Sequence, residues 1–229
     1  MPKSANALVV MAKAPLVGEV KTRLAPPLSL KEAAELYRCL LLDLLENVRS
    51  FEGADLYVAF SPAAAAALFH EITPRDFVCF PQRRGDLGER MASIFEDLFE
   101  KSYERAVVIG SDLPVFPSSF LRDAFRALAG SSDVVLGPSR DGGYYLIGLS
   151  RLVPEIFTGM PWGTARVLQA TRDRLSRVGV EPSLLPGWFD VDTVEDLKFL
   201  KQMVSTRTQT RTSKMIKKLS ILRDLPYRL

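Results

Sequence analysis

Short apolar runs alternate with longer amphipathic runs along most of the chain. The short runs have the length of strands, and the longer ones repeat their apolar positions with the period of a helix. The expected strands, in chain order, are NALVVMA, ADLYVAF, DFVCF, RAVVIGSD, SDVVLGP, YYLIGLS and PSLLPG. The expected helices are SLKEAAELYRCLLLDLLENV, SPAAAAALFH, GDLGERMASIFEDLFEK, PSSFLRDAFRALAG and TARVLQATRDRLSRVG.

Strands that alternate with helices predict a mostly parallel sheet with right-handed crossovers and helices on both faces. The run RAVVIGSD is apolar almost without interruption, as a strand covered on both faces must be. The strand YYLIGLS follows the Gly142-Gly143 pair, so we expect it to run antiparallel to its neighbour. The predicted architecture is a three-layer α/β/α sandwich.

Three helices have recognisable starts. Ser29 with Glu32, and Asp86 with Glu89, have the spacing of a capping box. Ser61 stands before a proline and suits an N-cap with proline at the first helical position. These signals predict helices that begin directly after each of the three residues.

Length and composition narrow the function classes. With 229 residues the chain has room for one large core, and we expect one domain over residues 1–204 followed by a tail over 205–229. It has neither a long apolar run nor a signal-peptide pattern, which favours the cytoplasm. His70 is the single histidine, and Cys39 and Cys79 lack partners at metal-binding spacing, so we expect buried cysteines and no His-based triad or zinc site.

Charged residues concentrate where the expected strands end. In parallel sheets the ligand crevice lies at the carboxyl ends of the strands. The first strand leads into MAKAPLVGEVKTRLAPP with Lys13, Lys21 and Arg23, and the third into PQRRGDLGER. Later strand ends are acidic, in SDLP, PSRDGGYY and FDVDTVEDL, with Asp112 and Asp192. Cations for phosphate and carboxylates for Mg²⁺ or Mn²⁺ are what a metal-dependent nucleotide site requires.

Each of these features also has a purely structural interpretation. Asp192 or Thr193 suits the N-cap of the helix VEDLKFL. Asp112 stands in a Leu-Pro turn, and Gly142-Gly143 suits a plain hairpin turn. A basic loop can simply be solvated. The argument for a site is that all these residues fall at strand ends.

Six segments in order carry a resemblance: MAKAPLVGEVKTRLAPPL, GDLGERM, GSDLP, GPSRDGGYYLIGL, PWGTARVL and DVDTVEDL. Over residues 6–200 the chain resembles a family of bacterial GT-A-type glycosyltransferases within the nucleotide-diphospho-sugar transferase superfamily. KAPLVGEVKTRL is also similar to 2-phospholactate guanylyltransferase. The resemblance implies a Rossmann-like GT-A fold, a divalent Mg or Mn cofactor, and a nucleotide or nucleotide-sugar donor with a small-molecule acceptor.

The resemblance also implies roles for individual residues. It assigns the metal to Asp112 and Asp192. The implied nucleotide-binding residues, with Gln82 and Gly85–Gly88 beside the base, are Ala12, Lys13, Lys21, Arg23, Gln82, Gly85, Asp86, Leu87 and Gly88. The implied acceptor or sugar residues are Asp141, Gly142, Gly143, Tyr144, Trp162 and Thr164. The implied catalytic residues are Lys21, Arg23, Asp112 and Asp141.

The sequence departs from the motifs of both nucleotidyltransferases and GT-A glycosyltransferases, so both reactions stay possible. The basic loop has only Gly18, where many nucleotidyltransferases have a glycine-rich phosphate loop. The strand end reads Ser111-Asp112-Leu113, where many GT-A glycosyltransferases have Asp-x-Asp. We expect glycosyl transfer, in which Asp141 accepts the acceptor's proton, and keep pyrophosphate-releasing nucleotidyl transfer, which needs no such base, as the alternative.

The tail supports a third, non-enzymatic hypothesis. Residues 201–229 hold eight Lys or Arg and one Asp, so the net charge of +3 leaves −4 on the rest of the chain. STRTQTRTS resembles a linker, and KMIKKLSILRDL is a basic amphipathic helix. We expect that helix to dock on its own domain or on a second subunit of a homodimer. A binding protein acting through this tail on an anionic membrane is the alternative, and nucleic acid is not expected.

Overall fold

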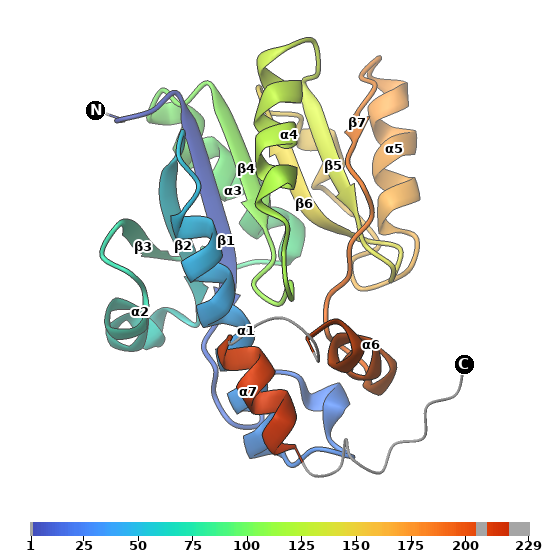
Figure 1. The fold of residues 1–229 in the computed structure, drawn as a ribbon. Helices are drawn as coiled ribbons and strands as arrows, with labels where there is room; N and C mark the ends of the chain where they lie inside the picture. The colour runs from blue at the N-terminus through green and yellow to red at the C-terminus, as the bar shows by residue number, and fades with distance from the viewer. Residues whose placement is uncertain (1, 205–209, 220–229) are drawn as a thin grey trace.

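A seven-stranded sheet forms the centre of the protein in the computed structural model, which describes residues 2–204 and 210–219 (Figure 1). The strand order is β3-β2-β1-β4-β6-β5-β7, and only β6 runs antiparallel to its neighbours. The strands are β1 (Asn6–Lys13), β2 (Asp55–Ser61), β3 (Phe77–Pro81), β4 (Arg105–Ile109), β5 (Val134–Pro138), β6 (Tyr144–Leu149) and β7 (Ser183–Leu184). The antiparallel strand after the glycine pair is as predicted.

Helices cover both faces of the sheet. The α-helices are α1 (Leu30–Arg49), α2 (Ala66–Ile72), α3 (Leu87–Glu100), α4 (Ser118–Ala129), α5 (Val167–Arg177), α6 (Val194–Val204) and α7 (Arg211–Lys218). Short 3₁₀ turns are η1 (Thr22–Leu24), η2 (Ala63–Ala65) and η3 (Pro154–Ile156). One apolar core lies between the sheet and α1, α2 and α4, and a second lies between the sheet and α3, η3 and α5. The predicted three-layer sandwich is confirmed.

The central strand β1 supplies both cores because its side chains alternate between the faces of the sheet. Leu8 and Val10 belong to the core under α1, whereas Ala7 and Val9 belong to the core under α3. Parallel neighbours flank it on both sides, β2 and β4. The loops after β1 and β4 therefore leave the same edge of the sheet, which brings distant parts of the sequence together.

Two of the three predicted helix starts are confirmed. Ser29 and Asp86 cap α1 and α3 in complete capping boxes. The prediction for Ser61 is wrong: it is the last residue of β2, paired with Lys13, and Pro62 is extended with ψ 163°, so α2 begins only at Ala66 after a 3₁₀ turn. A preceding strand that keeps its pairing outweighs a local capping signal.

The single histidine and the two cysteines are not fully buried. His70 lies in the last turn of α2, where the sequence places it. Cys39 and Cys79 are half-buried free thiols, so the prediction that both are buried holds only in part. Cys79 is less covered than expected because β3 is an edge strand.

The basic connection between β1 and α1 is anchored to the domain at buried apolar residues, although much of its surface is exposed. Val20 and Leu24 are buried, Leu24 in a third cluster with α1, α6 and α7. Lys21 precedes η1 with φ 50° and ψ 33°, a left-handed conformation that is uncommon for a residue other than glycine. The loop is therefore held at the sheet edge by apolar contacts on either side of Lys21.

The tail helix docks on its own domain, at the end of the sheet where α6 also lies (Figure 1). Met215, Ile216 and Leu219 are buried in the third cluster, and the Asp43 carboxylate of α1 accepts hydrogen bonds from the first backbone N–H groups of α7. Of the two docking modes expected for this helix, the structure shows docking on its own domain, with the apolar face covered by α1 and α6. The predicted linker 205–213 is wrong in its last part, because residues 211–213 form the first turn of α7, so the helix begins three residues before the KMIKKLSILRDL segment. Residues 205–209 and the apolar positions at 222 and 225 lie outside the described residues. None of the described helices has the length and apolar character needed to cross a membrane.

Candidate active site

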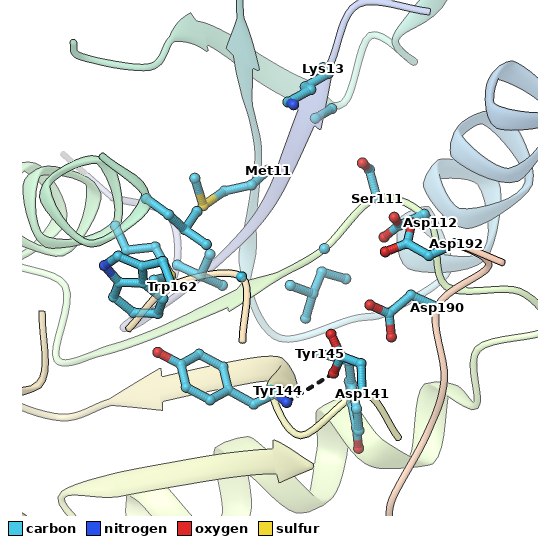
Figure 2. A pocket seen from close by; sticks show the side chains of 18 of the residues that line it. Met11, Lys13, Ser111, Asp112, Asp141, Tyr144, Tyr145, Trp162, Asp190 and Asp192 are labelled. Atoms are coloured by element: carbon cyan, nitrogen blue, oxygen red, sulfur yellow. Dashed lines mark hydrogen bonds between the residues drawn. The ribbon is translucent and has the colours of Figure 1, made fainter. Parts of the chain in front are cut away.

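A pocket of about 480 Å³ opens at the carboxyl ends of β1 and β4. Carboxylates gather on one side of it and the aromatic pair Tyr144 and Trp162 lies on the other, with Lys13 above (Figure 2). Most of the site residues implied by the sequence line it: Ala12, Lys13, Lys21, Arg23, Gln82, Leu87, Asp112, Asp141, Gly143, Tyr144, Trp162, Thr164 and Asp192. Gly85, Asp86, Gly88 and Gly142 lie outside the lining.

Lys21 joins the two acidic segments. Its Nζ donates to Asp112 Oδ2 and, at 2.7 Å, to Asp192 Oδ1. The Lys21 side chain is only 5% exposed. Burial on its own would lower the pKa of Lys21, but the carboxylates of Asp112 and then Asp192 outweigh it and raise that pKa above its ordinary value. The Lys21 ammonium therefore stays protonated between two carboxylates.

Thr193, and not Asp192, caps helix α6. The Thr193 hydroxyl accepts from Asp196 N–H at 3.2 Å, and the Asp196 carboxylate accepts from Thr193 N–H at 2.8 Å. This reciprocal cap leaves the Asp192 carboxylate free to point at Lys21. Burial opposes ionisation of Asp192, but Lys21, followed by Arg23 and Lys13, lowers its pKa. The structural alternative for Asp192, a helix cap, is not what its side chain does.

Lys13 and Arg23 are exposed cations on the same pocket. Among the residues that the structure describes, neither side chain forms an ion pair or a hydrogen bond. Lys13 uses only its backbone N–H, which donates to Tyr37 Oη at 2.9 Å. Two cations that lie near Asp192 but form no ion pair within the described residues suit an anionic ligand that also brings a metal.

Tyr37 was not predicted as a site residue. Its hydroxyl lies 2.7 Å from Ser111 Oγ, and burial raises its pKa to about 12. It projects from α1 beneath the carboxyl ends of β1 and β4 and so fixes the backbone on both sides of the pocket. In the sequence it occupies one more position of the helix's apolar stripe, and nothing distinguishes it from a core residue.

Asp190, which the sequence indicates together with Asp192 as a second acidic point, adds a further carboxylate to the pocket. Its carboxylate accepts a hydrogen bond from Ser139 Oγ and, among the described contacts, none from Lys21. Burial, and then the nearby charge of Asp112, raises the pKa of Asp190 to about 7. Figure 2 shows it between Asp141 and the Asp112–Asp192 pair. The pocket thus carries more negative charge than Lys21 alone neutralises.

The hairpin between β5 and β6 forms the opposite wall. Asp141 Oδ1 accepts from Gly143 N–H at 2.9 Å, which directs the exposed carboxylate (Figure 2). Gly142 has φ 87°, and a Cβ there would lie 2.3 Å from the Ala165 carbonyl oxygen. Glycine is therefore required at this position for the hairpin to pack on the loop that carries Trp162. Gly142 shapes the wall without contacting the pocket.

The segment after β3 positions the start of helix α3 beside the pocket. The Gln82 side-chain amide donates to the Ala59 carbonyl at 2.7 Å and accepts weakly from Arg90 at 3.5 Å. Asp86 is the N-cap of α3. A Cβ on Gly88 would lie 2.1 Å from the Phe157 carbonyl oxygen. Gln82, Leu87 and Arg90 line the pocket, and the cap at Asp86 and the close packing at Gly88 set the position of the helix that carries Leu87 and Arg90.

The Asp112–Asp192 pair fits a divalent cation in its chemistry. Two carboxylate oxygens from distant segments converge on one positively charged atom, Lys21 Nζ. Within the described ranges, no group of three or more His, Cys, Asp and Glu side chains is arranged to hold a metal. Mg²⁺ commonly takes one or two carboxylates and completes its coordination with water and substrate phosphates. The pair can therefore serve a metal that arrives with a phosphate ligand.

Comparison with known proteins places the chain in a family. Residues 44–164 match the family model described as "Uncharacterized protein conserved in bacteria (DUF2064)". A crystal structure of a proposed nucleotide-diphospho-sugar transferase from Desulfovibrio desulfuricans G20 is 33% identical, with 96% of each chain covered and a TM-score of 0.88. No curated protein matches the sequence.

More distant structures share the fold alone. A cytidylyltransferase from Leptospira borgpetersenii serovar Hardjo-bovis (strain JB197) is 14% identical, with a TM-score of 0.61 over 99% of this chain and 100% of the other. A 4-diphosphocytidyl-2C-methyl-D-erythritol synthase from Anaerococcus prevotii DSM 20548 is 10% identical, with a TM-score of 0.58 over 88% and 97%. The chain therefore belongs to the bacterial family DUF2064 and has the fold of the nucleotide-diphospho-sugar transferases, as the sequence motifs indicate.

Proposed function

We propose that the protein is a metal-dependent transferase that uses a nucleotide-diphospho-sugar and passes the sugar to a small acceptor. The observation that carries the proposal is the carboxylate pair Asp112–Asp192 in one pocket with Lys13 and Arg23, two cations that form no ion pair with any described residue. The similarity to the Desulfovibrio protein supports the same class of donor.

In this proposal the two sides of the pocket have separate tasks. Lys13 and Arg23 bind the phosphates of the donor, because both are free to do so and both face the carboxylate pair. Asp112 and Asp192 would hold Mg²⁺ or Mn²⁺, which would neutralise phosphate charge when bound. Tyr144 and Trp162 form an aromatic wall, with their ring centroids 6.4 Å apart in an edge-to-face arrangement. In this proposal the wall lies beside the sugar and excludes water from it.

Asp141 is positioned for the acceptor. Its carboxylate is exposed on the hairpin between β5 and β6 and lines the pocket. The Gly143 N–H donates to Oδ1, which leaves Oδ2 for the pocket. A carboxylate at hydrogen-bond distance from an acceptor hydroxyl would take its proton as the new glycosidic bond forms and the nucleoside diphosphate leaves. Lys13 and Arg23 would stabilise the charge on that leaving group.

A second candidate is nucleotidyl transfer with release of pyrophosphate. The observation in its favour is the concentration of Lys13, Lys21 and Arg23 on one loop, since three cations suit a triphosphate better than a diphosphate. A substrate phosphate would attack the α-phosphorus and needs no base, so Asp141 would only bind hydroxyl groups.

A thermal-shift screen separates these candidates. Nucleotide sugars, nucleoside diphosphates and nucleoside triphosphates are tested one by one, with and without Mn²⁺ or Mg²⁺, because a ligand specific for the folded state raises its stability by mass action. Metal-dependent stabilisation by one nucleotide sugar is the expected result and names the donor. A preference for a triphosphate would favour nucleotidyl transfer, and no shift with any nucleotide would contradict both.

A further inference from the structure

The ammonium group of Lys21 occupies the place where the carboxylate pair would hold a metal. Nζ contacts Asp112 Oδ2 and lies 2.7 Å from Asp192 Oδ1. Divalent cations bind carboxylate oxygens at about 2.0–2.6 Å, so a metal on the same two oxygens would take the same space and repel the ammonium. Lys21 and a divalent ion are therefore alternative occupants of one position.

The Asp112–Asp192 pair requires a cation between its carboxylates, either the Lys21 ammonium or a divalent ion. Asp112 Oδ2 and Asp192 Oδ1 converge on one atom, and the carboxylates of Asp141 and Asp190 line the same pocket. Among the described residues, Lys21 is the cation in contact with the pair. Lys21 thus keeps the acidic cluster compatible with folding before any ligand binds.

The backbone of Lys21 is anchored, whereas its side chain is suited to move. The Leu24 N–H donates to the Lys21 carbonyl at 2.9 Å, and the neighbouring Val20 and Leu24 are buried. The left-handed conformation of Lys21 directs the side chain inward from this fixed loop. A lysine ammonium is a point charge on four rotatable methylene groups, so it can leave the carboxylates without loop movement.

Lys13 and Arg23 show where the ammonium would go. Both line the same pocket as Lys21, and in the part of the chain that the structure describes neither forms an ion pair. A phosphate bound between them offers Lys21 a second anion. We propose that Lys21 is an exchangeable internal cation: it closes the Asp112–Asp192 metal position until ligand phosphate draws it away, so that phosphate and divalent metal bind cooperatively.

This proposal rests on the proposed function only for the identity of the phosphate ligand. Its core claim, competition between Lys21 and metal, is tested without nucleotide. Mn²⁺ alone is titrated into wild type, Lys21→Met and Lys13→Met, with free Mn²⁺ measured by electron paramagnetic resonance. Lys13→Met is the matched control, because it removes the same charge from the pocket without touching Asp112 or Asp192.

The expected result is about tenfold tighter Mn²⁺ binding by Lys21→Met than by Lys13→Met, within the usual range of coupling between sites. Equal affinities in the two variants would overturn the proposal. Lys21→Gln serves as a second variant if Lys21→Met folds poorly, since its amide still donates to a carboxylate but carries no charge. Circular dichroism establishes that each variant is folded before titration.

Sulfate tests the cooperative part, because it is a tetrahedral dianion that chelates Mn²⁺ weakly. At constant ionic strength, sulfate should tighten Mn²⁺ binding by wild type and leave Lys21→Met unchanged. Mn²⁺ affinity of wild type that does not respond to sulfate would overturn the coupling. A nucleotide screen that fails while Lys21→Met still gains Mn²⁺ affinity would contradict the proposed function and leave this inference intact.

Discussion

The hydroxyl oxygens of Tyr37 and Ser111 lie 2.7 Å apart, so helix α1 is bonded to the residue that precedes Asp112. The same Tyr37 oxygen accepts the Lys13 N–H at 2.9 Å. One helical side chain thus holds the strand ends that carry a phosphate-binding candidate and a metal-binding candidate. The separation of those two groups depends on a residue that contacts neither ligand in the proposed function.

Tyr37→Phe should destabilise the protein and weaken nucleotide binding together. The change leaves the buried Ser111 hydroxyl and the Lys13 N–H without their partner, at a cost of about 1–3 kcal/mol. Urea denaturation measures the free energy of unfolding, and calorimetry measures nucleotide affinity. Tyr57→Phe is the control. It removes a hydroxyl that lies 2.7 Å from Tyr103 Oη, near the amino ends of β2 and β4 and away from the pocket. A loss of affinity in Tyr57→Phe as large as that in Tyr37→Phe would contradict the positioning role of Tyr37.

Arg23→Met and Lys13→Met should each weaken binding of the nucleotide that stabilises wild type by about tenfold or more, because a charge-assisted hydrogen bond to phosphate is lost. Thermal stability without ligand should change little, since neither side chain forms an ion pair within the described residues and only their longer-range attraction to Asp192 is lost. Arg172→Met, on the exposed side of α5, is the control for removal of one surface charge. Unchanged affinity in both pocket variants would exclude Lys13 and Arg23 as phosphate ligands.

Asp141→Asn should lower kcat by about 10²–10⁴-fold if the enzyme transfers a sugar, because the acceptor loses its proton acceptor. Asparagine keeps the oxygen that accepts from Gly143 N–H, so the hairpin should keep its shape. Steady-state kinetics with the donor from the thermal-shift screen gives the result. Near wild-type turnover by a folded variant would remove Asp141 as the base and favour nucleotidyl transfer.

Gly88→Ala should destabilise the protein by about 1–3 kcal/mol, because an added Cβ overpacks a filled site. That Cβ would lie 2.1 Å from the Phe157 carbonyl oxygen and 2.7 Å from Trp162 Nε1. The displaced indole should also show a changed tryptophan fluorescence spectrum. Gly187→Ala is the control, since its Cβ would lie 3.7 Å from the nearest backbone oxygen, an ordinary contact. Equal stability of the two variants would contradict this packing.

The capping box of α1 should give a pH-dependent contribution to stability. The Ser29 N–H, and then its hydroxyl, lower the pKa of Glu32 below the unfolded value. A lowered folded pKa stabilises the fold above the unfolded pKa, and the contribution is lost as pH falls through the folded pKa. Glu32→Ala should therefore be less stable than wild type at pH 7, and the difference should shrink below about pH 4.

Thermal unfolding at several pH values measures that difference. Glu35→Ala is the control, because Glu35 is exposed on the same helix and forms no hydrogen bond of its own among the contacts of the described chain. A Glu32→Ala deficit that is constant from neutral to acid pH would show that the carboxylate's charge is not what stabilises the cap.

The sequence predicts the strands and the acidic strand ends well, because both follow from local pattern. Asp112 stands at the end of an apolar run that is buried on both faces, so its place at the pocket follows from topology. The start of α2 was not predictable, because the pairing of Ser61 with Lys13 is a contact between distant residues.

The same limit applies inside the site. Tyr37 differs from its apolar neighbours on α1 only in the oxygen that reaches Ser111, and that contact is between residues 74 positions apart. Sequence reasoning assigned Lys21 to phosphate, whereas the structure pairs it with Asp112 and Asp192. Charge and spacing indicate which residues meet, but not which of several opposite charges pair when all meet in one pocket.

The antiparallel strand β6 makes the hairpin wall intolerant of changes in length. Tyr144 packs toward the core under α3 and Tyr145 toward the core under α4, so one inserted or deleted residue before them would exchange the two faces. Such an exchange would move every core residue of β6 to the wrong layer. Replacement of side chains between Pro138 and Tyr144 would therefore change this wall of the pocket, whereas a change in the number of residues there would disturb the two cores on either side of β6.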